Sequence, residues 1–269
     1  MTPQNRLSML AFLFAFAATS MTHAAETPGA ASPDTAKEQR WADQIVGSLL
    51  VGTPEWLEAD SHKFLAIFTE EQSGTPKGGV ILLHGIGVHP DWPDVIHPLR
   101  SELPEHGWAT LSIQLPVLPN EAEFDDYLPL IQAAAPRIRA ALAFLKSKDI
   151  RPVVLAGHSL GAVMGSAALA EGDGLELAGF VAIGMGQGRD PRVDTTAQLA
   201  KLRVPVFDLY GSRDLDAVRA TIPVRAAAAR RAGLKHYRQT EVVGADHFFV
   251  GQEEELVRRV RGWLEQLPQ

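Results

Sequence analysis

Short apolar runs alternate with longer amphipathic segments along most of the chain. The short runs have the length and the β-branched and aromatic content of buried strands. These predicted strands are residues 64–69, 79–84, 109–115, 152–157, 179–184, 204–210 and 237–243. The segments between them have the apolar spacing of helices that bury one face. These predicted helices are residues 92–106, 124–146, 160–171, 195–201, 217–232 and 253–267. Such alternation predicts an α/β fold, with a mostly parallel sheet and helices on both of its faces.

The N-terminus has the pattern of a secretory signal peptide. Arg6 supplies a positive charge, residues 7–18 are almost wholly apolar, and the small residues Thr22 and Ala24 flank His23 at the −3 and −1 positions of a cleavage site. The apolar run of about 12 residues is too short to cross roughly 30 Å of hydrocarbon. We therefore expect export with cleavage near Ala24, to the periplasm in a Gram-negative bacterium, and no stable membrane anchor.

The rest of the chain predicts one folded domain. Residues 1–24 form the predicted signal peptide, residues 25–36 are small and proline-containing and predict a disordered lead, and residues 37–269 predict a single domain. The chain has 269 residues, of which 46% are hydrophobic and 21% are charged, and this composition fits a globular protein.

Composition also excludes several classes of partner and cofactor. The net charge is −7 and no long basic run is present, which argues against nucleic-acid binding. The absence of cysteine excludes disulfides, thiolate metal sites and a cysteine nucleophile. His84, His89 and His97 lack zinc-ligand spacing, and residues 184–191 lack the third glycine of a dinucleotide loop. We therefore expect no metal and no cofactor.

The motif Gly157-His158-Ser159-Leu160-Gly161 joins a predicted strand to a predicted helix. In this context, G-x-S-x-G makes a sharp turn that exposes the serine above the sheet, and its glycines avoid clashes with that turn. Ser159 is thus the candidate nucleophile, the alternative being a structural turn. We expect His158 to point into the scaffold.

A second glycine-rich turn follows the predicted strand 79–84, in the sequence His84-Gly85-Ile86-Gly87. In an acyl-transfer enzyme such a loop supplies one backbone N–H to the oxyanion, and the residue after the nucleophile supplies the other. The candidate oxyanion donors are therefore the N–H groups of Ile86 and Leu160. The alternative is a plain turn.

Two further strand ends carry the remaining candidate residues. Asp214 lies just beyond the predicted strand 204–210, and His247 lies beyond the final strand. The chain order Ser159, Asp214, His247 is that of α/β-hydrolases. Other aspartates near these strands leave the choice of acid open: Asp190, Asp208, Asp216 and Asp246. Asp246 also has the position of a turn-former that holds the histidine loop.

From residue 64 to the C-terminus, the chain resembles the α/β-hydrolase superfamily of serine hydrolases. More narrowly, residues 81–93 (ILLHGIGVHPDWP) and 107–116 (GWATLSIQLP) are similar to a bacterial family of exported α/β-hydrolases known only as a domain of unknown function. The superfamily resemblance implies a nucleophile at Ser159, a base at His247 and an acid at Asp214, which act by two-step acyl transfer on a small-molecule ester. Peptidase, thioesterase and acyltransferase reactions use the same residues, and a binding protein without catalysis is a further alternative.

The sequence also bears on the shape of the cleft. Only about 18 residues separate Gly184 from Val204, which leaves no room for a large cap domain and predicts an open cleft for small or exposed acyl groups. Acidic residues cluster in residues 121–126. They either place a negative field over the cleft or form the solvated start of a helix.

Overall fold

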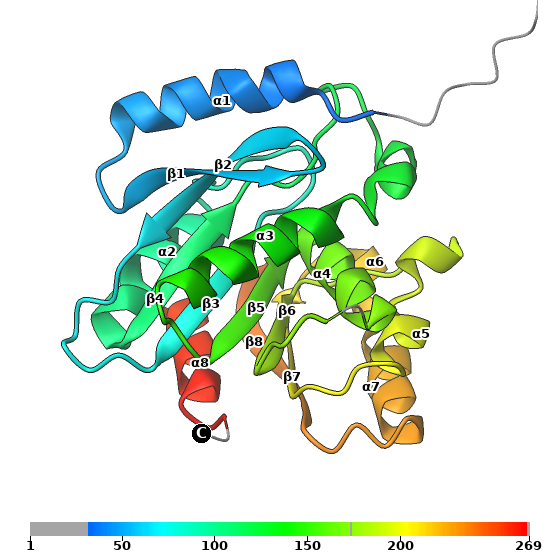
Figure 1. Cartoon of the computed structure of the whole chain (residues 1–269). Coiled ribbons are helices and arrows are strands. Elements are labelled where there is room, and N and C mark those ends of the chain that lie inside the picture. Colours follow the sequence, from blue (N-terminus) through cyan, green and yellow to red (C-terminus); the bar gives the residue numbers. More distant parts are fainter. Residues whose placement is uncertain (1–31, 173, 268–269) are drawn as a thin grey trace, which may run out of the picture. The chain divides into compact units, whose positions relative to one another are not determined.

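The computed structural model describes residues 32–172 and 174–267 (Figure 1). The predicted signal peptide and residues 25–31 of the predicted lead lie outside this part of the chain. Helix α1 (Thr35–Ser48) begins inside residues 25–36, so the prediction of disorder is wrong at the end of that segment. Asp34 caps the helix by accepting the Lys37 N–H at 2.9 Å. The helix buries Ala42 and Ile45 in a small cluster with residues of β2, and this packing orders it.

The core of the fold is an eight-stranded sheet with the order β1-β2-β4-β3-β5-β6-β7-β8. Its strands are β1 (Thr53–Ala59), β2 (His62–Thr69), β3 (Gly78–Leu83), β4 (Trp108–Ile113), β5 (Val153–His158), β6 (Gly179–Ile183), β7 (Val206–Arg213) and β8 (Tyr237–Asp246). The strands β4, β3, β5, β6, β7 and β8 are parallel to one another, whereas β2 is antiparallel to both β1 and β4. The mostly parallel sheet is confirmed. The edge strand β1, which buries only Leu57, was not predicted from the sequence.

Helices cover both faces of the sheet, as the alternation of strand and helix predicts. They are α2 (Ile96–Glu102), η1 (Leu103–His106), η2 (Phe124–Leu130), α3 (Ala134–Ser147), α4 (Leu160–Glu171), η3 (Pro191–Val193), α5 (Thr195–Leu199), α6 (Asp216–Arg219), α7 (Ile222–Arg231) and α8 (Glu253–Leu264). In Figure 1, α3 and α4 lie in front of the sheet, and α2 and α8 lie behind it. In β3, Ile81 and Leu83 enter the first core, whereas Val80 and Leu82 enter the second.

Three predicted helices are broken into two or begin late. Proline accounts for the breaks, because it lacks a backbone donor and disfavours helical geometry in the residue before it. Pro129 lies in the last turn of the short 3₁₀ segment η2, before α3 begins, and Pro223 lies in the first turn of α7, a helix separate from α6. The predicted helix 92–106, which contains Pro93, begins only at Ile96, after Val95 adopts a φ of 59°.

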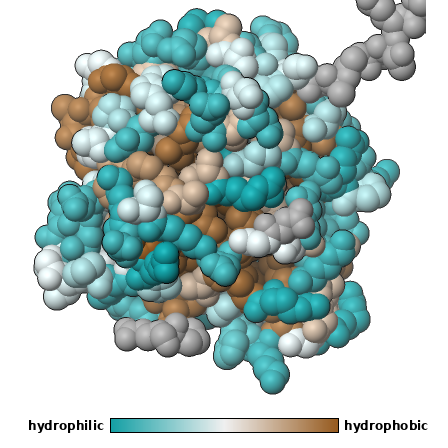
Figure 2. Space-filling model, in the orientation of Figure 1, coloured by the Kyte–Doolittle hydropathy of each residue, from teal (hydrophilic) through white to brown (hydrophobic). Residues whose placement is uncertain are grey.

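The connection from β6 to β7 holds only η3 and α5. No large cap domain is present in the described residues, as the length of this connection predicts. Within the same residues, no single helix is long and apolar enough to cross a bilayer, although η2 and α3, bent by 61°, would together have the necessary length and composition. Polar residues cover much of the face in Figure 2, with apolar patches between them.

A buried ion pair ties α7 to the sheet. The Arg225 guanidinium donates to both oxygens of the Asp208 carboxylate, at 2.8 and 3.0 Å, and both side chains are fully buried. Gln239 donates to the same carboxylate at 3.0 Å, and Arg225 also donates to the carbonyl of Met185 at 2.6 Å. The pair therefore connects α7, β7 and the loop that follows β6.

Asp208→Ala is expected to lower the free energy of unfolding by about 3–5 kcal/mol, because it leaves a buried guanidinium without its counter-charge. Urea denaturation measures the loss. The matched control is Asp216→Ala, which removes an exposed partner of Arg219 and should change stability little. Equal stability of the two variants would contradict the prediction.

Candidate active site

Ser159 lies in the turn between β5 and α4 with φ 55° and ψ −120°, a conformation that L-residues rarely adopt. The glycines around it permit the close approach of backbone segments. A Cβ on Gly157 would lie 2.7 Å from the nitrogen of Ala162, and one on Gly161 would lie 2.4 Å from the carbonyl oxygen of His84. This geometry agrees with the strained turn expected from G-x-S-x-G.

The structure brings Ser159, Asp214 and His247 together. The Ser159 hydroxyl donates to Nε2 of His247 at 3.0 Å, and the Nδ1–H of His247 donates to the Asp214 carboxylate at 2.6 Å. Asp214 and His247 are buried, at 3% and 5% exposure. Asp214 directly follows the last residue of β7, and His247 directly follows the last residue of β8, because both strands continue three residues beyond their predicted ends.

The other aspartates all have different partners. Asp190 pairs with Arg192, Asp208 pairs with Arg225, and Asp216 is fully exposed. Asp246 accepts the N–H groups of residues 248 and 250 and so forms the turn that holds the histidine loop. Of these candidates, Asp214 is the aspartate that contacts the imidazole in the described part of the chain.

The predicted oxyanion residues lie beside the nucleophile. The start of α4, which carries Leu160, abuts the end of β3, and a Cβ on Gly85 would lie 3.5 Å from the Cβ of Ser159. The hydrogen bonds found among the described residues leave the N–H groups of Ile86 and Leu160 without an acceptor. Both groups are therefore free to donate to a ligand.

His158 contacts His247, the candidate catalytic base, and helps to hold it in place. Its Nε2–H donates to the carbonyl of His247 at 2.9 Å, and the two ring centroids are 4.8 Å apart. Burial, with a smaller contribution from His247, lowers the pKa of His158 to about 4, so the ring is neutral near pH 7. The expectation that His158 points into the scaffold agrees with this position. Its partner is 89 residues away, and no local pattern indicates the contact.

Gly184 was not identified from the sequence as part of this region. It has a φ of +56°, and a Cβ there would lie 3.0 Å from the ring of His247 and 3.4 Å from Asp214 Oδ2. A glycine at this position therefore leaves the space that the imidazole and the carboxylate occupy.

The acidic segment 121–126 leads into η2 at the edge of the site. Glu123 and Asp126 form a reciprocal capping box at the start of η2, which agrees with a solvated helix start. The segment also lies near the candidate oxyanion loop and the β6–β7 connection. The Tyr127 hydroxyl is 3.6 Å from the Cβ position of Gly87, and the Phe124 ring is 3.6 Å from that of Gly188.

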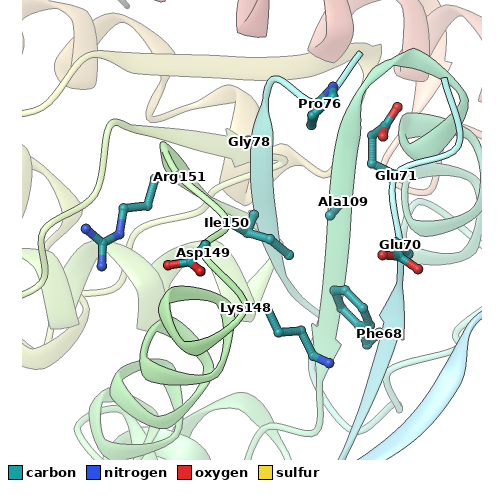
Figure 3. A pocket seen from close by; sticks show the side chains of 10 residues that line it. All are labelled: Phe68, Glu70, Glu71, Pro76, Gly78, Ala109, Lys148, Asp149, Ile150 and Arg151. Atoms are coloured by element: carbon teal, nitrogen blue, oxygen red, sulfur yellow. The ribbon is translucent and has the colours of Figure 1, made fainter. Parts of the chain in front are cut away.

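A cavity of about 640 Å³ lies at the opposite end of the sheet, against the amino ends of β3 and β5 (Figure 3). Its charged lining carries both signs, in Glu70, Glu71, Lys148, Asp149 and Arg151, and does not favour one class of ligand. No cluster of histidine and carboxylate side chains suited to a metal ion occurs within residues 32–172 and 174–267.

Several solved structures, two of which are named as esterases, share this fold. Est1E from Butyrivibrio proteoclasticus superposes with a TM-score of 0.61 at 16% identity, over 80% of this chain and 98% of that one. The esterase domain of a Rhodothermus marinus protein gives 0.59 at 16% identity, over 81% and 99%. The Pyrococcus furiosus esterase Pf2001 gives 0.60 at 16% identity, over 80% and 92%. The fold is therefore that of the α/β hydrolases.

A comparison with curated proteins finds no significant match. A family model covers nearly the whole sequence, over residues 7–127 and 125–266. The chain belongs to the family described as "Protein of unknown function (DUF3530)", with the fold of α/β hydrolases.

Proposed function

We propose that the protein is a serine hydrolase that cleaves small or exposed carboxylic esters through an acyl-enzyme at Ser159. The observation that carries the proposal is the continuous hydrogen-bonded series from Ser159 through His247 to Asp214. Nucleophile, base and orienting carboxylate are in contact, which is the arrangement that nucleophilic catalysis requires. Neighbours of the same fold that are named as esterases support the same class of reaction.

In the first step, Ser159 Oγ attacks the ester carbonyl while Nε2 of His247 takes the hydroxyl proton. The Asp214 carboxylate holds the imidazole in its Nδ1–H tautomer and stabilises the imidazolium that forms. The imidazolium then protonates the leaving alcohol. Water attacks the acyl-enzyme in the second step, with His247 again as the base, and releases the acid.

The negative oxygen of each tetrahedral intermediate lies between the N–H groups of Ile86 and Leu160 in this proposal. Donors aimed at a developing charge lower the barrier more than they strengthen ground-state binding, and one such donor contributes about 10²–10³ in rate. The close approach of Gly85 to Ser159 supports this assignment.

Two features support a small or exposed acyl group. The described residues contain no large cap, and apolar side chains lie exposed at the site. Phe248 is 43% exposed, with its ring centroid 5.1 Å from that of His247, and Phe124 at the edge is 38% exposed. These aromatic rings offer a surface for an apolar or aromatic acyl group. A solved structure of Est1E holds ferulic acid, which makes aromatic acyl esters a reasonable part of the substrate screen.

Ser159→Ala and His247→Ala are each expected to lower kcat on a p-nitrophenyl ester by about 10⁴–10⁶-fold, because each removes a group that acts in the transition state. Steady-state kinetics on the purified protein measure the loss. Ser166→Ala is the matched control, since its hydroxyl is buried in α4 and bonds to the Val163 carbonyl and the Gln198 side chain, neither of which belongs to the candidate site. Retention of wild-type kcat by Ser159→Ala would overturn the assignment.

An open cleft predicts hydrolysis of acetyl and butyryl esters in solution, with falling kcat/KM for long acyl chains. It also predicts that the rate follows dissolved substrate concentration smoothly, because residues 32–172 and 174–267 form no large lid that must open at a lipid surface. A series of acyl chain lengths and a tributyrin titration through its solubility limit test both points. A sharp rise in rate when the emulsion forms would contradict the open cleft.

A further inference from the structure

We propose that His84 and Arg137 are positioning residues that orient and polarise the Ile86 N–H through a head-to-tail series of hydrogen bonds. This inference rests on the proposed function, since it assigns a role to groups behind the candidate oxyanion donor. Neither residue touches the substrate position. The series runs from Arg137 through the peptide group of residues 114–115 and through His84 to the peptide group of residues 85–86.

The last bond of the series fixes the peptide group that carries the donor. The Nδ1–H of His84 donates to the carbonyl oxygen of Gly85 at 2.8 Å. This carbonyl and the Ile86 N–H belong to one planar trans peptide group, so they point in opposite directions. Holding the Gly85 oxygen against His84 therefore aims the Ile86 N–H away from that ring.

His84 can hold this position because both ring nitrogens have partners. Its Nε2 accepts the Leu115 N–H at 2.9 Å and the Gln114 side-chain amide at 3.0 Å. The ring is 1% exposed, and burial lowers the pKa of His84 to about 3. The neutral ring, with its proton on Nδ1, therefore persists near pH 7. A proton on Nε2 would face the Leu115 N–H and break the series.

Arg137 holds the other side of the 114–115 peptide group. Its Nη1 donates to the Gln114 carbonyl at 2.9 Å, while the Leu115 N–H of the same group donates to His84. The guanidinium is itself held by the Glu38 carboxylate of α1 through two bonds, of 2.9 and 3.0 Å. Glu38 and Arg137 are both about 95% buried, so their positions are well defined.

Every donor in the series points the same way. Arg137 donates to the carbonyl of Gln114, Leu115 donates to His84, and His84 donates to Gly85. Hydrogen bonds in such a series polarise one another, by about 10–30% per bond. The cationic guanidinium at the start makes each later N–H a stronger donor. The resulting gain at Ile86 grows as negative charge develops on the carbonyl oxygen, so it acts on kcat and leaves KM nearly unchanged.

The bond from Arg137 to the Gln114 carbonyl is not needed to hold α1 in place. The carboxylate of Glu38 already holds the guanidinium with two bonds, and the additional bond on Nη1 goes to the peptide group in contact with His84. Helix α1, which was not predicted from the sequence, thereby contributes to the support of the site.

The test compares three variants with the wild type in ester hydrolysis, thermal stability and inhibition by a trifluoromethyl ketone, which forms an oxyanion on the serine. His84→Leu removes both ring contacts, and His84→Asn retains an amide that can donate to the Gly85 carbonyl. Glu38→Leu combined with Arg137→Leu removes the buried pair together, which avoids leaving one charge unpaired. Thr110→Val is the matched control, because it removes a buried hydrogen bond of β4 to the Arg100 carbonyl.

His84→Leu is expected to lower kcat by about 10- to 100-fold, less than the loss of a whole oxyanion donor, with KM within twofold of the wild type. The ketone should bind more weakly by the same factor. His84→Asn should recover part of the loss, the double variant should lose several-fold, and Thr110→Val should keep the wild-type kcat. Wild-type kcat and ketone affinity in a folded His84→Leu protein would overturn the proposal. So would a rise in KM at unchanged kcat.

A second measurement separates this proposal from the proposed function. The ring ¹⁵N chemical shifts of His84 report its tautomer in the full protein, and they do so equally in Ser159→Ala. The Nδ1–H neutral form at pH 7 is expected in both proteins, and an Nε2–H form would overturn the series of hydrogen bonds. A wild type that hydrolyses no ester but shows the expected tautomer would count against the proposed function and leave the geometry standing.

Discussion

The left-handed backbone at Ser159 is the constraint on which the rest of the site depends. A non-glycine residue with φ 55° and ψ −120° persists only where its surroundings hold it. The Ser159 N–H donates to the Ile183 carbonyl of β6 at 2.9 Å, and the glycines at 157 and 161 admit backbone atoms at distances that no Cβ could tolerate. The turn thereby places the serine hydroxyl within hydrogen-bonding distance of Nε2 of His247.

The parallel sheet supplies the other groups because its strands end at one edge. The loops after β3, β5, β7 and β8 bring a candidate oxyanion donor, the serine, the carboxylate and the imidazole to the same place. Buried polar contacts then hold these loops. His158 binds the carbonyl of His247, His84 binds the loop after β3, and Arg225 binds the carbonyl of Met185, the residue after Gly184. Two of the four loops, those after β3 and β8, and the loop after β6 are therefore held from inside the protein.

The fold and the candidate triad could be predicted from the sequence because their signals are local. Buried parallel strands are continuous apolar runs, and Asp214 and His247 each follow such a run. The edge strand β1 and the helix α1 gave no comparable signal, since β1 buries only Leu57 and α1 is ordered by contacts with β2. Apart from the adjacent Gly85, the partners of His84 and Arg137 named here are 23 to 99 residues away in the sequence, so only the folded chain reveals them.

The most direct test of the central claim is fluorophosphonate labelling of the purified protein, with the adduct mapped by mass spectrometry. An activated serine attacks this phosphorus centre, whereas an ordinary hydroxyl does not. The account predicts one adduct on Ser159, and none at that position in His247→Ala, which keeps the serine but lacks its base. An unlabelled Ser159 in folded wild-type protein, or equal labelling of the two proteins, would contradict it.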